Sequence, residues 1–109
     1  MTWEPELEEL RRREALARGM GGPERVARQH ASGRLTVRER IERLLDAGSF
    51  HESGALAGVG RYENGELTDF TPANMVVGSG RIEGRRVVVE GDDFTVRGGA
   101  ADAAIWQKM

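Results

Sequence analysis

The first half of the chain carries hydrophobic residues at three- and four-residue steps, the spacing of an amphipathic helix. One such stripe contains Trp3, Leu7, Leu10 and Ala17. The glycine-rich segment 19–22 ends this helix, and the proline at position 23 suits the first turn of a short second helix. The pattern therefore predicts two successive helices before residue 32.

The clearest helix signal lies at 36–47. Thr36-Val37-Arg38-Glu39 matches a capping box, in which the Thr36 and Glu39 side chains each accept a hydrogen bond from the other residue's backbone amide. An apolar face follows, made of Val37, Ile41, Leu44 and Leu45. Gly48 offers the left-handed backbone that commonly ends a helix. We therefore expect a helix over 36–47 that ends at Gly48.

After Gly48 the hydrophobic spacing becomes extended. The segment 50–57 has a weak strand pattern, and Asn64-Gly65 is a strong hairpin signal within 62–67. Two further strands, 74–82 and 85–90, are predicted on either side of a turn at 83–84. Because the three valines at 87–89 are consecutive, we expect their strand to be covered on both faces, and to attract other chains if it is exposed.

The end of the chain combines a short apolar segment, two glycines and an alanine-rich run. The pattern predicts a strand at 94–96 and a helix at 100–109, joined at Gly98-Gly99. Such a junction places free backbone amides at the start of a helix, where a phosphate or a thioester oxygen can approach. Many junctions of this kind are only tight turns, and taken alone the pattern favours that ordinary interpretation.

Composition narrows the class of protein. The chain has 109 residues, of which 31% are charged and 39% hydrophobic, so it is one small domain or part of a larger one. The net charge of −2, with acidic and basic groups interleaved, argues against nucleic-acid or anionic-membrane partners. The lack of cysteine excludes disulfides and thiolate chemistry and suits a reducing compartment. The charged N-terminal segment is unlike a signal peptide, and we expect a cytoplasmic protein without membrane spans.

Several familiar motifs are absent on inspection. The glycines of 78–84 resemble a dinucleotide fingerprint, but their spacing is one residue too long and a strand follows, so a hairpin is the better interpretation. His30 and His51 have no second ligand at helical spacing, so no metal site is expected. Asp92 and Asp93 are adjacent on an extended segment and should point to opposite faces, which prevents a shared acid–base role.

Three blocks of sequence stand out when they are taken together. The first is RQHASGRLTVRERI at 28–41, which runs into LLDAGSF at 44–50. The second is VVGSGRIEGRRV at 76–87, and the third is DFTVRGGA at 93–100. In this order and spacing they closely resemble the N-terminal region of the carboxyltransferase (beta) subunit of biotin-dependent acyl-CoA carboxylases, the propionyl-CoA and methylcrotonyl-CoA carboxylase group. The resemblance extends from about residue 4 to the last residue.

The resemblance implies a fold and an activity. It implies an α/β chain in which N-terminal helices, 1–48, precede the first ββα portion of a crotonase-like fold, 49–109, which is incomplete. Members of the family move a carboxyl group from carboxybiotin to the α-carbon of an acyl-CoA, through an enolate that backbone amides stabilise. The biotin is carried by a partner protein, and a second catalytic subunit, the biotin carboxylase, charges it. Oligomeric assembly with these partners and with the remainder of the carboxyltransferase is therefore expected.

The resemblance also assigns candidate contacts for the acyl-CoA. These are Phe94, Arg97 and the backbone amides of Gly98, Gly99 and Ala100. Family members commonly have an aromatic residue where this sequence has Arg97, so the acyl group stays open. An arginine there could contact a CoA phosphate, or lie exposed or paired with a carboxylate. The family's oxyanion-hole glycines and its biotin-receiving half match no part of this sequence, so no catalytic residue is assigned.

Two hypotheses of different classes follow. In the first, these residues are the N-terminal part of a biotin-dependent carboxyltransferase and do not turn over alone. In the second, the chain is a short non-catalytic subunit that assembles such a complex or binds CoA. A third, weaker alternative is an incomplete gene product without function. The coding sequence beyond residue 109 would distinguish the first from the others.

Overall fold

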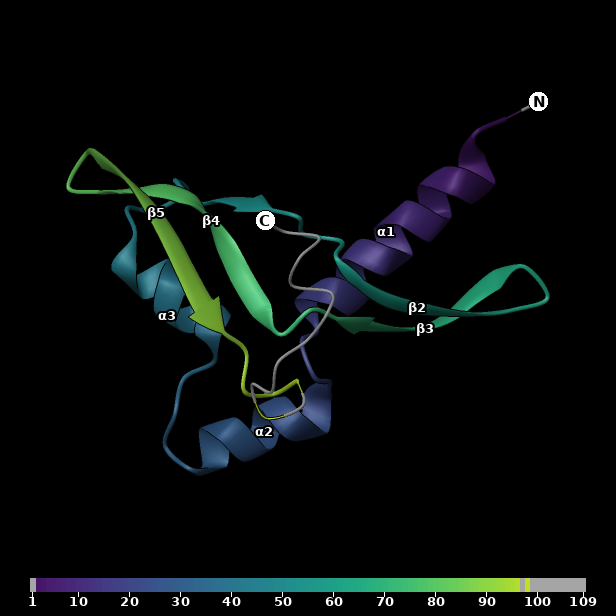
Figure 1. The fold of residues 1–109 in the computed structure, drawn as a ribbon, viewed down its shortest axis with the longest axis horizontal. Helices are drawn as coiled ribbons and strands as arrows, with labels where there is room; N and C mark the ends of the chain where they lie inside the picture. Colours follow the sequence, from purple (N-terminus) through teal and green to yellow (C-terminus); the bar gives the residue numbers. More distant parts are fainter. Residues whose placement is uncertain (1, 97, 99–109) are drawn as a thin grey trace.

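The computed structural model describes residues 2–96 and residue 98, and it contains helices followed by strands (Figure 1). The helices are α1 (Glu4–Arg18), α2 (Pro23–Ala31) and α3 (Val37–Leu44). The strands are β1 (His51–Ser53), β2 (Gly58–Glu63), β3 (Glu66–Pro72), β4 (Met75–Ile82) and β5 (Arg85–Asp92). This order agrees with the predicted α/β class. The predicted helix at 100–109 lies outside the described residues.

The strands form two separate antiparallel sheets. One sheet has the order β1-β4-β5, with β4 in the centre, and the other is the β2–β3 hairpin. Both long hairpins turn through two residues with positive φ, Asn64-Gly65 in the first and Glu83-Gly84 in the second. Turns of this kind match the twist of the flanking strands. The hairpin predictions at 62–67 and at 83–84 are therefore confirmed.

The main core lies between α3 and the three-stranded sheet. Its buried residues are Ile41, Leu45 and Val76, and further apolar side chains from α3, the sheet and the segment between them pack around these three. Gly80 of β4 leaves room for this packing, since a Cβ there would lie 2.5 Å from Leu45 Cδ1. The alternating burial along β4 and β5 shows that this sheet covers the core with one face.

The predicted helix boundary at 36–47 is partly wrong. The capping box at Thr36 and Glu39 is present, but α3 ends at Leu44, and Leu45 already has an extended backbone. Leaving the helix there buries the Leu45 side chain on the sheet and lets the Asp46 amide donate to the Arg81 carbonyl at 2.7 Å. Gly48 does have a positive φ of 71°, but it belongs to the turn at 47–48 that follows α3 and does not end the helix.

Three strand predictions also need correction. Of the segment 50–57 only His51–Ser53 is a strand, because the chain turns at Gly54, whose φ is 61°. The predicted strand at 94–96 is a turn, in which the Val96 amide donates to the Asp93 carbonyl at 3.2 Å. Within the described residues β5 is covered on one face only, since the Val88 side chain is 80% exposed.

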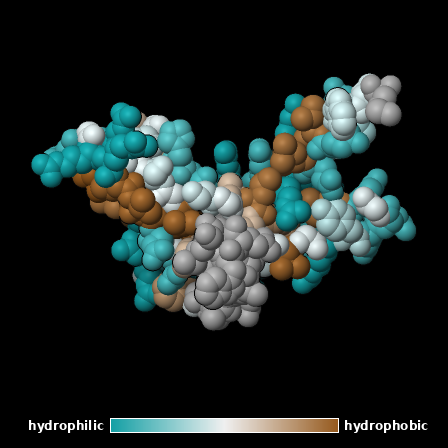
Figure 2. Space-filling model, turned by 45° about the horizontal axis from the view of Figure 1, so that its top comes forward, coloured by the Kyte–Doolittle hydropathy of each residue, from teal (hydrophilic) through white to brown (hydrophobic). Residues whose placement is uncertain are grey.

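The second sheet and α1 form an arm that projects from the rest of the molecule (Figure 1). The radius of gyration is 15.0 Å, larger than the roughly 13 Å expected for a compact chain of this length. Three apolar side chains of the predicted α1 stripe are exposed: Trp3, Leu7 and Leu10. Figure 2 shows hydrophobic surface both on the side that carries α1 and on the side that carries the β4–β5 hairpin. The molecule thus leaves much apolar surface uncovered.

Candidate functional site

The turn that follows β5 has one exposed side chain among buried ones. Asp93, Thr95 and Val96 are buried, whereas the Phe94 ring between them is 60% exposed. Asp92 is exposed and Asp93 is buried, so the two carboxylates face opposite sides, as the sequence predicted. The turn therefore presents one aromatic ring to solvent on a well-packed base.

The Asp93 carboxylate sets the conformation of this turn. Its Oδ1 atom accepts hydrogen bonds from the Thr95 amide at 2.9 Å and from the Thr95 hydroxyl at 2.5 Å. Aspartate side chains often stabilise turns by bonding to the backbone two residues ahead. This local bonding competes with strand pairing, which explains why 94–96 is a turn although its residues are strand formers.

The same threonine joins the turn to the segment between α1 and α2. Thr95 Oγ1 accepts a hydrogen bond from the Gly21 amide at 3.0 Å. A Cβ at Gly21 would lie 1.7 Å from the Thr95 carbonyl oxygen, so this approach requires glycine. Two segments that are distant in the sequence are thereby fixed side by side, with α2 directly after the contact.

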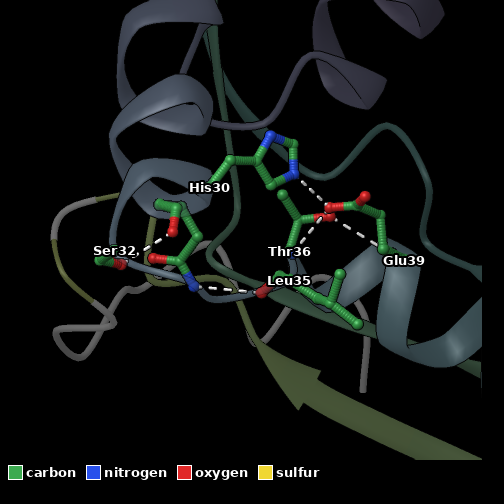
Figure 3. A network of polar contacts seen from close by, with 6 residues as sticks. His30, Ser32, Leu35, Thr36 and Glu39 are labelled. Carbon is green, nitrogen blue, oxygen red and sulfur yellow. Dashed lines mark hydrogen bonds and ion pairs between the residues drawn. The ribbon is translucent and has the colours of Figure 1, made fainter.

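Helix α2 is held in place at its C-terminal end by polar contacts (Figure 3). Gln29 Nε2 donates to the Leu35 carbonyl at 3.2 Å, and the Ser32 hydroxyl donates to the Gln29 carbonyl at 2.8 Å. His30 Nε2 lies 2.6 Å from Glu39 Oε1, which also accepts from the Thr36 amide at 2.9 Å. The hydrogen bonds from His30 and then from Thr36 lower the pKa of Glu39 from 4.5 to about 2. Glu39 therefore stays ionised and ties α2 to α3.

A groove of about 470 Å³ lies between α2 and the turn after β5. Its lining residues are Arg25, Arg28, Gln29 and Ser32 from α2, and Phe94, Thr95 and Gly98 from the turn. Arg25 and Arg28 are three positions apart and share a face of the helix. In the described part of the chain neither arginine forms an ion pair. The groove thus combines two uncompensated cations with an exposed aromatic ring.

The structure brings together some of the predicted site residues. Phe94 and Gly98 both line the groove, and Gly98 has a φ of 60°, which suits glycine. Arg97, Gly99 and Ala100 lie outside the described residues. Sequence reasoning missed Arg25 and Arg28, which form an Arg-x-x-Arg spacing in a helix that the pattern did predict.

Metal-binding and membrane-spanning features were also searched for among the described residues. No cluster of three His, Asp or Glu side chains that could hold a metal is found among residues 2–96 and 98. His30 bonds to Glu39, and His51 is exposed at the first position of β1. None of the described helices is long and apolar enough to cross a lipid bilayer.

Comparison with known proteins gives consistent matches. The sequence profile of the carboxyl transferase domain matches residues 28–109. The propionyl-CoA carboxylase beta chain of Cereibacter sphaeroides is 46% identical over 105 residues, which cover 94% of this chain and 20% of that relative. The methylmalonyl-CoA carboxyltransferase 12S subunit of Propionibacterium freudenreichii subsp. shermanii is 41% identical over 101 residues, covering 92% and 19% respectively.

A solved structure extends the match to three dimensions. The crystal structure of transcarboxylase 12S, a hexamer with methylmalonyl-coenzyme A and methylmalonic acid bound, superposes with a TM-score of 0.80 and 38% identity. The superposition covers 99% of this chain and 21% of that one. The predicted crotonase-like α/β class is thereby confirmed. The chain spans about one fifth of the length of the relatives that it matches.

Proposed function

The chain belongs to the carboxyl transferase domain family, and from this membership we propose that it is the N-terminal part of a biotin-dependent acyl-CoA carboxyltransferase. In the proposed reaction the α-carbon of an acyl-CoA loses a proton and gains the carboxyl group, while carboxybiotin loses that group and regains a proton. The 46% identity to a propionyl-CoA carboxylase beta chain, over nearly the whole of this chain, carries the proposal.

The turn after β5 is the proposed acyl-CoA contact. We propose that Phe94, Arg97 and the amides of Gly98, Gly99 and Ala100 lie against the substrate. The positive φ of Gly98 and the exposed ring of Phe94 support this assignment, since the backbone there is free of a side chain and the ring is available to a ligand. Fixed backbone amides stabilise negative charge because they need no reorganisation when the charge develops.

Partners and location follow from the same proposal. Biotin would arrive on a carrier protein after a biotin carboxylase has charged it, and the remainder of the carboxyltransferase would supply the second half of the site. The solved relative is a hexamer, which supports an oligomeric assembly for this protein as well. We propose a cytoplasmic location, which the cysteine-free composition suits.

The direct test measures carboxyl transfer by the protein in its native assembly, with propionyl-CoA and free carboxybiotin as substrates. We expect carboxylated acyl-CoA from the assembly and no turnover from the 109-residue chain alone. Replacing Gly98 by valine should lower kcat/KM at least tenfold, because a β-branched residue disfavours a positive φ.

The matched control is Arg43→Gln, at an exposed position of α3 away from the groove, which should leave kcat/KM unchanged. Absence of both acyl-CoA binding and carboxyl transfer in the native assembly would contradict the proposed function. Measurable turnover by the isolated chain would contradict the claim that it depends on further protein.

A further inference from the structure

We propose that the exposed apolar stripe of α1 binds the same stripe of a second copy of this chain, with the two helices antiparallel. The stripe consists of Trp3, Leu7 and Leu10, and Glu14 lies at its end. The contact involves only the arm, so it is independent of the proposed carboxyl transfer and of the groove beside α2. It gives the proposed oligomeric assembly a defined surface.

The stripe lies on a side of α1 that the rest of the described chain leaves open. The β2–β3 hairpin holds the helix from another side, where the Arg13 guanidinium carbon lies 4.6 Å from the centre of the Phe70 ring. Trp3 is 70% exposed, and Leu7 and Leu10 are each 43% exposed. The arm carries these side chains away from the α3 core (Figure 1), and hydrophobic surface is visible on that side (Figure 2). A row of exposed apolar side chains along one helix face is typical of an interaction surface.

The spacing of the stripe matches the seam of a two-helix contact. Positions 3, 7, 10 and 14 alternate steps of four and three residues, which is the heptad spacing of coiled coils. The next position of the same series is Ala17, which is buried within the arm at 3% exposure. The open seam thus ends before Ala17, and Leu7 and Leu10 form its centre.

The charges of α1 are divided between its two halves. The first half contains four glutamates and no basic residue, whereas the second half contains four arginines and one glutamate: Glu4, Glu6, Glu8 and Glu9, then Arg11, Arg12, Arg13, Arg18 and Glu14. None of these side chains forms an ion pair within the described part of the chain. This division suits the dipole of the helix itself. It also makes α1 complementary to a second α1 that runs in the opposite direction, whereas a parallel partner would place glutamates against glutamates.

One antiparallel register satisfies both the apolar and the charged positions. When Leu7 of one copy packs against Leu10 of the other, a twofold axis passes through the middle of the seam. Glu4 and Arg11 are seven residues apart, so they flank the stripe on the same side. Each Glu4 then faces Arg11 of the second copy, and the contact contains this pair twice.

The same register provides a partner for the glutamate in the seam. A carboxylate that enters an apolar contact is unfavourable unless it accepts hydrogen bonds. Glu14 of one copy lies beside Trp3 of the other, and the indole N–H of a tryptophan is a hydrogen-bond donor. The pairing thus uses all four positions of the open seam.

The test measures dissociation of the native assembly on dilution, by sedimentation equilibrium. Glu4→Arg and Arg11→Glu should each raise the Kd about tenfold, because each change turns an attraction that occurs twice into a repulsion. The double variant Glu4→Arg, Arg11→Glu exchanges the two charges and should restore the native Kd. Glu8→Arg reverses a charge of the same helix away from the stripe, and as the matched control it should leave the Kd unchanged.

Cross-linking tests the direction of the helices. These 109 residues contain no cysteine, so introduced thiols are the only ones among them. A mixture of the Leu7→Cys and Leu10→Cys proteins should form disulfide-linked dimers on oxidation. Trp3→Cys alone should form none, because the antiparallel register separates the two copies of this position by roughly 16 Å along the helices, beyond the reach of a disulfide.

The outcomes separate this inference from the proposed function. A Kd that is insensitive to both Glu4→Arg and Arg11→Glu, with unchanged circular dichroism spectra, would overturn the proposal and assign the stripe to another segment or partner. Weakened association in both single variants without recovery in the double variant would overturn the antiparallel charge pairing, as would cross-linking through Trp3→Cys. Association through α1 in a protein that carboxylates no acyl-CoA would retain the contact and refute the function.

Discussion

The two parts of this molecule are stabilised in different ways. The three-stranded sheet packs α3 against it around Ile41, Leu45 and Val76, each at most 7% exposed. In the arm, α1 lies along β3 but leaves Leu7 and Leu10 each 43% exposed. The first part has a core of its own, whereas the second part buries Leu67 and Phe70 of β3 but leaves most of the apolar stripe of α1 exposed.

Within the arm, polar contacts of Arg13 help to hold α1 against the β2–β3 hairpin. The Arg13 guanidinium carbon lies 4.6 Å from the centre of the Phe70 ring, and Arg13 Nη2 donates to the Leu56 carbonyl at 3.3 Å. Such contacts orient a helix, but they contribute less than the burial of several large side chains. The arm therefore depends less on apolar burial than the α3 core does.

The largest contrast is expected from cavity-forming substitutions. Ile41→Ala should lower the free energy of unfolding by about 2–4 kcal/mol, because it removes buried methyl groups from the core. Leu7→Ala should lower it by less than about 1 kcal/mol, because that side chain is already partly in water. Chemical denaturation of both variants measures the difference. Equal losses would show that α1 is packed as tightly as α3, and would contradict the comparison.

The next contrast compares one glycine from each sheet, Gly78 of β4 and Gly60 of β2. A Cβ at Gly78 would lie 2.3 Å from the His51 carbonyl oxygen, which cannot move without breaking the pairing of β1 with β4. Gly78→Ala should therefore cost about 1–3 kcal/mol of stability. At Gly60 in the arm the nearest atoms belong to side chains, at 3.1 Å and 3.3 Å, so Gly60→Ala should cost less. The two melting temperatures test this order, and a reversed order would refute it.

A smaller effect is expected at the polar contact of the arm. Arg13→Lys retains the charge but loses the planar group over Phe70, and should cost about 0.5–1 kcal/mol. Arg12→Lys, at an exposed position of the same helix, is the matched control. Thermal unfolding of the two variants gives the comparison. An Arg13 variant as stable as the control would mean that the arm is held by other contacts.

The smallest effect concerns the link between α2 and α3. Because the pKa of Glu39 is lowered from 4.5 to about 2, its ionised form stabilises the fold above pH 4.5, and this contribution is lost as the pH falls towards 2. Glu39→Gln retains a hydrogen-bonding side chain for the capping box but removes the charge. The difference in melting temperature between the native protein and the variant should therefore shrink as the pH falls over this range. A constant difference would contradict the assignment.

Local signals predicted much of the fold. The capping box at Thr36 and the two turns, at 64–65 and 83–84, depend on residues that are neighbours in the sequence, and all three are present. The end of α3 was misplaced because Leu45 leaves the helix to pack on β4, a strand that begins 30 residues further along the chain. The prediction of a strand at 94–96 was wrong because the Thr95 amide donates a hydrogen bond to the Asp93 side chain. Strand propensity, which depends on residue type, does not take such a bond into account.

Only some of the residues that line the groove were predicted from the sequence. Phe94 and Gly98 were found because they lie in the block at 93–100, which resembles the carboxyltransferase family. Arg25 and Arg28 were not, since their position opposite that turn depends on the contact between Gly21 and Thr95. A pattern of charges along one helix does not reveal which distant segment the helix will face.

That contact also has a consequence for the order of folding. Gly21 and Thr95 are 74 residues apart, whereas the β4–β5 hairpin closes through two residues. Closing the longer loop costs on the order of 2–3 kcal/mol more chain entropy, and hairpins of this kind form within about 1–10 μs. We therefore expect the hairpin to form early and the groove to assemble among the last steps. A nascent chain would then form the groove beside α2 only after the β4–β5 hairpin is in place.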